Sequence, residues 1–141
     1  MKVLRIVFLV ILIFIFTCTQ SFTDLMYKGI IGFRFNSDPN FMEMLQFRLT
    51  DLMNEHYIIQ KIGHFSSFGI LAGFIYSWLK KYRLALLVAI SYAVSTEILQ
   101  LFFFRDGRIV DMFIDTAGVV TALLLIIIKK QVDIEAVKSA K

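Results

Sequence analysis

Apolar residues are concentrated in four long runs, which are separated by one long polar segment and two short ones. The runs comprise residues 3–19, 62–79, 84–104 and 109–128. Each run matches the roughly 17–25 residues with which a helix crosses the hydrocarbon core of a bilayer. The pattern predicts an all-α protein, a polytopic membrane bundle with four transmembrane helices that forms a single domain over residues 1–141.

The first apolar run also has features of a secretory signal peptide, because a basic start at Lys2 precedes it. The stretch Ile15-Phe16-Thr17-Cys18 weakly suggests a lipoprotein cleavage site. A small residue is wanted directly before such a cysteine, and Phe16 and Thr17 fit this requirement poorly. We therefore expect the first run to be retained as a helix. Cleavage would leave the second run entering the membrane from the same side.

The long polar segment, residues 20–60, contains a helix signal of its own. Asp38-Pro39 combines a capping side chain with a proline suited to the first helical turn. Apolar residues then recur at helical spacing, at Phe41, Leu45, Leu49 and Leu52. Charged residues fall on the other faces, at Glu43, Arg48, Asp51 and Glu55. The segment predicts an amphipathic helix that lies on the outer membrane surface or, as an equal alternative, packs over the bundle.

Composition supports a membrane protein over a water-soluble domain. The chain is 58% hydrophobic with a mean hydropathy of +0.74, whereas soluble domains are about 45–50% apolar. The net charge of +4 comes from residues at the ends of the apolar runs, which is typical of topology signals. We therefore expect no nucleic-acid partner. Cys18 is the single cysteine of the chain, so an intrachain disulfide is excluded.

Lys and Arg residues divide unequally between the two sides of the predicted bundle. Nine lie on the side of both termini: Lys2, Arg5, Lys80, Lys81, Arg83, Lys129, Lys130, Lys138 and Lys141. Six lie opposite: Lys28, Arg34, Arg48, Lys61, Arg105 and Arg108. The positive-inside rule predicts that both termini are cytoplasmic. Residues 20–60 would then form an outer loop and residues 129–141 a cytoplasmic tail of a multi-pass protein in the bacterial cytoplasmic membrane.

Polar residues within the apolar runs fall at one level of the predicted membrane. They are His64, Glu97, Gln100, Asp111 and Asp115, with Lys61 in the first turn of the second run. At a rise of about 1.5 Å per residue, Glu97 lies about 12 Å below Arg105. Ionisable groups at membrane depth are costly and are therefore functional or paired. Three helices would bring these groups together near the outer face.

Helical faces predict that these side chains point into the bundle. Small residues mark close helix contacts in membranes, and they share faces with the acids. The stripes are Ala89, Ala93, Glu97 and Gln100 in the third run, and Asp111, Asp115, Gly118 and Ala122 in the fourth. In the second run the small residues lie away from His64, at Ser66, Gly69, Gly73 and Ser77. We expect this glycine face to contact another helix while His64 faces a shared pocket.

Structural roles could explain each polar residue separately. Lys61 could be a snorkelling interfacial anchor, and Arg105 and Arg108 could be topology charges. His64 could lie at the interface as an amphipathic residue, while Asp111 could stabilise a helix N-terminus. These roles explain the joint pattern less well than they explain its single members.

Three motifs follow one another along the chain. They are Lys61-Ile62-Gly63-His64, Thr96-Glu97-Ile98-Leu99-Gln100-Leu101-Phe102 followed by Arg105, and Asp111-Met112-Phe113-Ile114-Asp115-Thr116-Ala117-Gly118. As an ordered set they resemble the VanZ-like family of bacterial membrane proteins. The resemblance extends from Lys61 to about Ile128. It differs at Asp115, where asparagine is the commoner family residue. It implies an integral protein of the cell envelope and a link to resistance against the glycopeptide teicoplanin, with which the family's namesake is associated.

The resemblance and the residues leave several functions open. The first is a non-enzymatic pocket, facing outward, that binds a lipid headgroup or lipid-linked envelope intermediate. Its ligand-binding residues would be Lys61, His64, Glu97, Gln100, Arg105, Arg108, Asp111 and Asp115. The second is a membrane-embedded enzyme acting on a lipid-linked substrate, with His64 and Glu97 as an acid–base pair. Its candidate catalytic residues are His64, Glu97, Asp111 and Asp115.

Cofactor and transport functions are less well supported. Asp111, Asp115 and His64 are suitable metal ligands, but no recognised metal motif is present, and we expect no cofactor. Buried acids and histidine could also form a proton relay. Because they lie at one level and do not continue inward, a path across the membrane would require a homo-oligomer.

Overall fold

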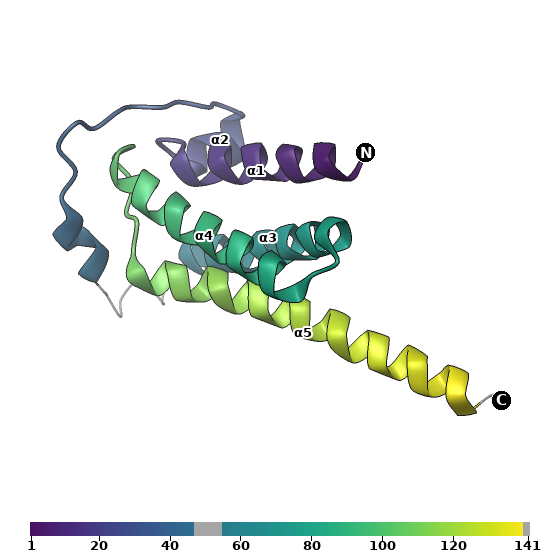
Figure 1. The fold of residues 1–141 in the computed structure, drawn as a ribbon. Helices are drawn as coiled ribbons and strands as arrows, with labels where there is room; N and C mark the ends of the chain where they lie inside the picture. Colours follow the sequence, from purple (N-terminus) through teal and green to yellow (C-terminus); the bar gives the residue numbers. More distant parts are fainter. Residues whose placement is uncertain (47–54, 140–141) are drawn as a thin grey trace.

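Helices are the only regular elements within the parts of the chain that the structure describes, residues 1–46 and 55–139 (Figure 1). This is a computed structural model. The elements in chain order are α1 (Lys2–Cys18), α2 (Phe22–Lys28), the 3-10 helix η1 (Phe41–Leu45), α3 (Glu55–Leu79), α4 (Tyr82–Leu101) and α5 (Ile109–Ser139). The predicted all-α class is confirmed.

Three helices, α3, α4 and α5, are each long and apolar enough to cross a membrane. A fourth span results if α1 and α2, which meet at an angle of 113°, are counted together. The prediction of four transmembrane helices agrees with this upper count. Large apolar side chains on the outer surfaces, such as Phe8, Leu87 and Leu124, are more than half exposed. Such faces suit lipid, because hydrocarbon does not penalise exposed apolar side chains.

Helix boundaries differ from the predicted runs at three places. The described part of α3 begins at Glu55, seven residues before the predicted start at Ile62. Helix α4, which corresponds to the third predicted run, ends at Leu101, because residues 102–104 turn away and Phe104 adopts a positive φ of 53°. Helix α5, which corresponds to the fourth run, continues to Ser139, so residues 129–139 of the predicted tail are helical. Hydropathy marks where a helix leaves hydrocarbon, and the backbone can remain helical beyond that point.

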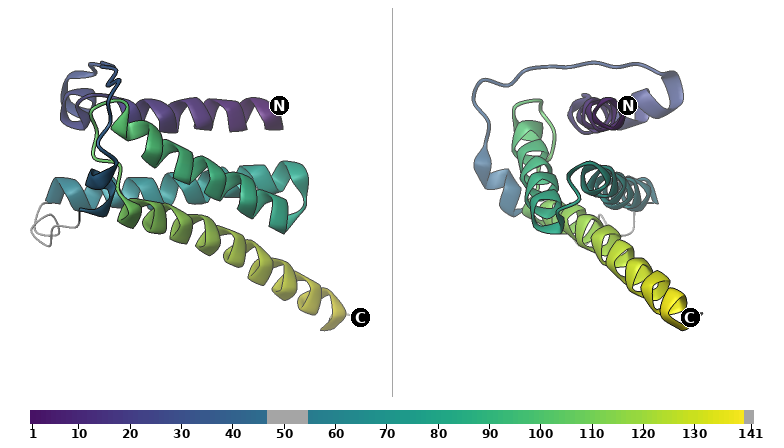
Figure 2. Two further views of the ribbon diagram at one scale, coloured as in Figure 1. Left: turned by 60° about the vertical axis from the view of Figure 1, so that its left-hand side comes forward. Right: turned by 45° about the vertical axis from the view of Figure 1, so that its right-hand side comes forward.

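The bundle is built around α3, which contacts α1, α4 and α5. In Figure 2, α1 lies along one side of the bundle and α5 extends beyond it on another. A hydrogen bond from the Tyr92 hydroxyl to the Val10 carbonyl, 2.6 Å long, joins α4 to α1. The first helix is therefore held by a polar contact as well as by packing.

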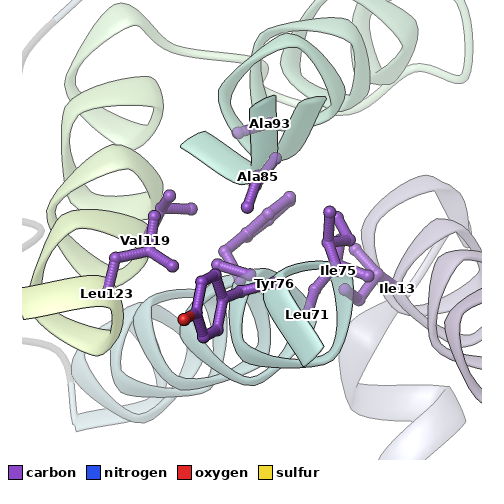
Figure 3. Packing of buried hydrophobic residues seen from close by; sticks show 11 residues of the cluster. Ile13, Leu71, Ile75, Tyr76, Ala85, Ala93, Val119 and Leu123 are labelled. Carbon is purple, nitrogen blue, oxygen red and sulfur yellow. The ribbon is translucent and has the colours of Figure 1, made fainter. Parts of the chain in front are cut away.

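Buried apolar side chains from four helices pack together in the core of the bundle (Figure 3). Ile13 contributes from α1, Leu71 and Ile75 from α3, Ala85 from α4 and Val119 from α5. Alanine at the α4 positions leaves room for the larger side chains of α3 and α5. This core supports the polar residues that lie further along the same helices.

Glycines bring α3 and α5 into close contact, as the small-residue stripes predicted. A Cβ atom built on Gly69 would lie 3.0 Å from the carbonyl oxygen of Gly118. One built on Gly118 would overlap the backbone of Phe65. Helices approach this closely only where side chains are absent. The contact aligns α3 and α5 so that His64 and Asp115 can meet.

The connection between α2 and α3 covers one end of the bundle. The backbone N–H of Asn36 donates to the Phe102 carbonyl over 2.7 Å, and its side chain donates to the Leu101 carbonyl over 3.3 Å. Asn36 thereby satisfies carbonyls that the end of α4 leaves without helical partners. Phenylalanine rings from the connection and from α1 pack against Phe103.

The predicted amphipathic helix is observed in part, as η1. Asn40 caps it by accepting a hydrogen bond from the Met42 N–H over 3.2 Å. The predicted cap was Asp38, but its own N–H is bonded to the Asn36 side chain, 3.1 Å away, in a turn before the helix. The predicted positions Leu49 and Leu52, with Arg48 and Asp51, lie outside the described residues.

Both chain termini lie at one end of the bundle, which we call the terminal end (Figure 1). The opposite end contains the start of α3, the end of α4 and the start of α5, and we call it the polar end. This arrangement matches the predicted common side for the two termini. It also brings all three polar motifs to the same end.

Candidate functional site

His64 lies in the polar end, where α3 packs against both α4 and α5. The side chain is buried, and its Nδ1 atom lies 3.2 Å from Oδ1 of Asp115 and 3.9 Å from Oε1 of Glu97. Each of the three residues belongs to a different helix. The contact with Asp115 is of hydrogen-bond length, so Asp115 is the nearer partner of the imidazole.

Glu97 is completely buried, and both oxygens of its carboxylate accept hydrogen bonds. The amide of Gln100 donates to Oε1 over 2.7 Å, and the backbone N–H of Arg108 donates to Oε2 over 3.0 Å. The second bond requires residues 102–108 to fold back over the end of α4. Gly107 makes this possible, because a Cβ atom there would overlap the Glu97 carbonyl.

Lys61 and Asp111 form an ion pair between α3 and α5, with 2.6 Å between Nζ and Oδ2. Both side chains are largely buried. The ammonium group also lies 4.7 Å from the ring centre of Tyr57. The other carboxylate oxygen, Oδ1 of Asp111, is buried and has no hydrogen-bond partner within the described residues.

A polar pocket of about 250 Å³ opens above this pair. Three cations contribute to its wall: Lys61, Arg105 and Arg108. The other lining residues are Tyr57, Gln60, Gln100, Phe104, Asp106 and Asp111. Because the cations outnumber the acids, the pocket favours an anionic group.

Arg105 and Arg108 lie in the connection between α4 and α5 and have different contacts. Arg108 contacts Asp106 over 3.2 Å. Arg105 donates to the Gln20 carbonyl over 3.4 Å, but its Nε atom is buried without a hydrogen-bond partner in the described part of the chain. Burial lowers the pKa of Arg105, because desolvation disfavours the charged form.

Two apolar grooves adjoin the polar pocket. One, of about 400 Å³, lies between α1, α2 and α3 and is lined by His64 and Gln60 among apolar side chains. Gln60 also lines the polar pocket. The second, of about 350 Å³, lies between α3 and α5 and shares Tyr57 and Lys61 with the pocket. The polar pocket thus shares lining residues with two surfaces suited to hydrocarbon chains.

Comparison with known proteins identifies the family. A family model described as VanZ/LLP1 matches residues 3–130. The chain belongs to the VanZ/LLP1 family. It is 35% identical over 102 residues to an uncharacterized membrane protein, YwnJ, of Bacillus subtilis (strain 168), and the match covers 72% of this chain and 73% of that one. No solved structure shows a significant match.

Membership of the VanZ/LLP1 family confirms the family assignment made from the ordered motifs. The family match also extends beyond the half of the chain on which that assignment depended, into α1. The finding supports an integral membrane protein.

The residues of the three motifs meet as the sequence predicted, but some partners differ. His64, Glu97 and Asp115 form one buried cluster, while Lys61 and Asp111 form a separate pair. Gln100 connects the two, because it is bonded to Glu97 and also lines the pocket. Arg105 and Arg108 line the pocket wall, and the backbone N–H of Arg108 also donates to Glu97 of the buried cluster.

Sequence reasoning missed several residues of this VanZ/LLP1 site. Tyr57 and Gln60 were assigned to the outer loop because hydropathy rises only at Ile62, yet both lie on α3. Each precedes a motif residue, Lys61 or His64, by four positions, and this helical spacing could have revealed them. Gln20 and Gly107 carry no local signal, since their contacts depend on how connections fold across the bundle.

One group within the described residues has the composition and spacing of a metal site. His64, Glu97 and Asp115 each offer a ligand atom, and these atoms lie within 4.8 Å of one another. The set considered from the sequence contained Asp111, whose Oδ2 is instead paired with Lys61. Glu97 takes its place in the observed group.

Proposed function

We propose that this protein binds the anionic headgroup of a membrane lipid or lipid-linked envelope intermediate in the polar pocket, without converting it. The observation that carries the proposal is the buried Nε atom of Arg105, which has no hydrogen-bond partner in the described residues and belongs to a residue of the pocket wall. An unsatisfied guanidinium donor is costly, and a phosphate or carboxylate oxygen is its strongest acceptor.

The arrangement of acids around the pocket supports an anionic ligand. Asp111 is paired with Lys61, which holds the ammonium group at the pocket wall. Asp106 contacts Arg108 in the same way. These pairs orient the cations, and Arg105 is left as the donor best placed for a ligand.

The apolar grooves favour a lipid over a free anion. Gln60 joins one groove to the pocket, and Tyr57 and Lys61 join the other. An amphipathic molecule could therefore place its headgroup in the pocket and its hydrocarbon along α3. A soluble phosphate would use only the pocket.

We further propose an outward-facing pocket in the bacterial cytoplasmic membrane, with both termini cytoplasmic. The distribution of Lys and Arg supports this orientation. By binding an envelope intermediate on that side, the pocket would alter the access of an external glycopeptide to this intermediate. Resistance to teicoplanin would follow from this effect.

Native mass spectrometry of the detergent-solubilised protein tests lipid binding. The probes are a short-chain diacyl phosphatidic acid, the matching neutral diacylglycerol and inorganic phosphate. We expect selective binding of the phosphatidic acid, and at least about tenfold weaker binding by Arg105→Gln, equivalent to about 1.4 kcal/mol. Arg83→Gln, at the terminal end, is the matched control and should bind normally. If Arg105→Gln bound phosphatidic acid as tightly as Arg83→Gln does, the proposal would be refuted. If wild type bound diacylglycerol as tightly as phosphatidic acid, headgroup recognition would be excluded.

Teicoplanin and vancomycin susceptibility in a sensitive Gram-positive host tests the resistance role. Strains carrying empty vector, wild type, Arg105→Gln or Glu97→Gln would be compared at equal membrane levels. Protection against teicoplanin that is lost in the variants would support the proposal. Absence of protection from well-expressed wild type would reject resistance while leaving lipid binding to its own test.

An enzymatic role is the second candidate, and His64 is the observation that favours it. The imidazole lines an apolar groove and contacts Asp115, with Glu97 close by. This geometry suits a general base and an orienting carboxylate. Asp115 lies at the shorter distance, and Glu97 is the partner that the sequence predicts. Mass analysis of lipids incubated with wild type, His64→Gln and Glu97→Gln tests it. Conversion by wild type alone would favour the enzyme, and unchanged lipids in all samples would reject it.

A further inference from the structure

We infer that His64, Glu97 and Asp115 form a binding site for one divalent transition-metal ion. Their ligand atoms come from α3, α4 and α5 respectively and lie within 4.8 Å of one another. Imidazole and carboxylate together suit Zn²⁺ and Mn²⁺. The site is distinct from the proposed headgroup pocket and does not depend on it.

The distances between ligand atoms fit a coordinated ion. Zn–N and Zn–O bonds of about 2.0–2.2 Å in a tetrahedral arrangement separate the ligand atoms by roughly 3.3–3.6 Å. The Nδ1 atom of His64 lies 3.2 Å from Oδ1 of Asp115 and 3.9 Å from Oε1 of Glu97. Because all three ligand atoms lie within 4.8 Å of one another, closer approach of the carboxylates would bring them to a common ion.

The charges of the cluster also favour a cation. Glu97 and Asp115 are completely buried, and the nearest buried ammonium group, that of Lys61, is already paired with Asp111. His64 alone can supply at most one positive charge to two carboxylates. A divalent ion would neutralise both acids and leave His64 neutral, as a metal ligand must be.

Outer contacts hold the ligands as they do in known metal sites. Gln100 and the Arg108 backbone donate to Glu97, so its carboxylate is oriented before an ion binds. The Gly69–Gly118 contact keeps α3 and α5 close. His64 of the cluster lines the apolar groove, and Gln100, which donates a hydrogen bond to Glu97, lines the polar pocket. Three protein ligands leave a further coordination position for water or a bound molecule.

Metal content of the full chain, purified without an affinity tag and stripped with chelator, tests the inference. The protein would be equilibrated with Zn²⁺, Mn²⁺ or Co²⁺ in detergent, dialysed and analysed by inductively coupled plasma mass spectrometry. We expect about one ion per chain in wild type. Glu97→Gln and Asp115→Asn should each weaken binding more than about tenfold, because losing a ligand costs more than losing an outer contact.

Matched variants separate a metal site from loss of folding. Asp133→Asn makes the same change as Asp115→Asn at an exposed position of the same helix and should bind metal like wild type. Gln100→Leu should weaken binding by about tenfold through its effect on Glu97. Monodisperse elution of each variant in size-exclusion chromatography would verify folding.

Two further measurements decide the result. Co²⁺ bound at the site should give visible absorption bands that are absent from Glu97→Gln and Asp115→Asn. Zn²⁺ should raise the thermal unfolding temperature of wild type and Asp133→Asn, with no rise in the two ligand variants. Equal metal content in wild type and folded ligand variants, or no stoichiometric binding by wild type, would overturn the inference. Neither result would affect the lipid-binding test, which measures a different ligand with Arg105→Gln.

Discussion

At the scale of single residues, the ion pair of Lys61 and Asp111 joins α3 to α5 inside the polar end. Removing one member of a buried pair leaves the other charge without compensation, which typically costs about 3–5 kcal/mol. We therefore expect Lys61→Met and Asp111→Asn each to lower the unfolding free energy, with the smaller loss in Asp111→Asn because an amide keeps some polar contact.

A double-mutant cycle measures this coupling. Thermal or SDS-induced unfolding in micelles would be followed for wild type, both single variants and Lys61→Met/Asp111→Asn. The double variant should lose less stability than the sum of the single losses, because each partner's uncompensated charge is removed with it. Strict additivity would show that the pair contributes nothing beyond its separate members.

Gly107 is needed at the polar end because of space, not turn conformation. A Cβ atom there would overlap the Glu97 carbonyl, whereas one on Gly63 would have no atom within 4 Å. We expect Gly107→Ala to lower the unfolding free energy by about 1–3 kcal/mol through overpacking. Gly63→Ala, the control, should be neutral or raise it by up to about 1 kcal/mol, because alanine favours the helix. Equal unfolding temperatures of the two variants would contradict this account.

At the scale of elements, the contact between α3 and α5 determines the geometry of the buried cluster. Gly118 abuts the Phe65 backbone, but Gly73 meets only the distant end of Ile126, 3.9 Å away. We expect Gly118→Ala to separate the helices and lower the unfolding temperature, and Gly73→Ala to have little effect. Thermal unfolding in detergent micelles would measure both effects. Unaltered stability of Gly118→Ala would refute a role for close packing.

At the scale of the whole molecule, both termini lie at the end opposite the polar cluster. The positive-inside rule then predicts that Asp38 is extracellular and Asp133 cytoplasmic. In a Cys18→Ser background, a membrane-impermeant thiol reagent should label Asp38→Cys in intact cells. It should label Asp133→Cys only after permeabilisation. The reverse pattern would invert the orientation and place the polar pocket at the cytoplasmic face.

Much of the fold could be predicted because the hydropathy of a segment indicates whether it lies in hydrocarbon or in water. The apolar runs indicated the four spans, and the small-residue stripes indicated faces for close helix contact. The pairing of the α3 face with the α5 face came from the structure. Helix ends were predicted less well, as in α5, which continues to Ser139. Leaving hydrocarbon does not by itself end a helix, since the backbone hydrogen bonds can continue in water.

The common level of His64, Glu97 and Asp115 could be derived from the sequence, because helical rise and span direction are local properties. Their partners became known only from the packing of the helices. His64 lies nearer to Asp115 than to Glu97, Lys61 selects Asp111, and the fold of residues 102–108 brings the Arg108 N–H to Glu97. These choices depend on helix rotation and on ångström-scale separations, which arise from packing across the bundle and leave no periodic signal along the chain.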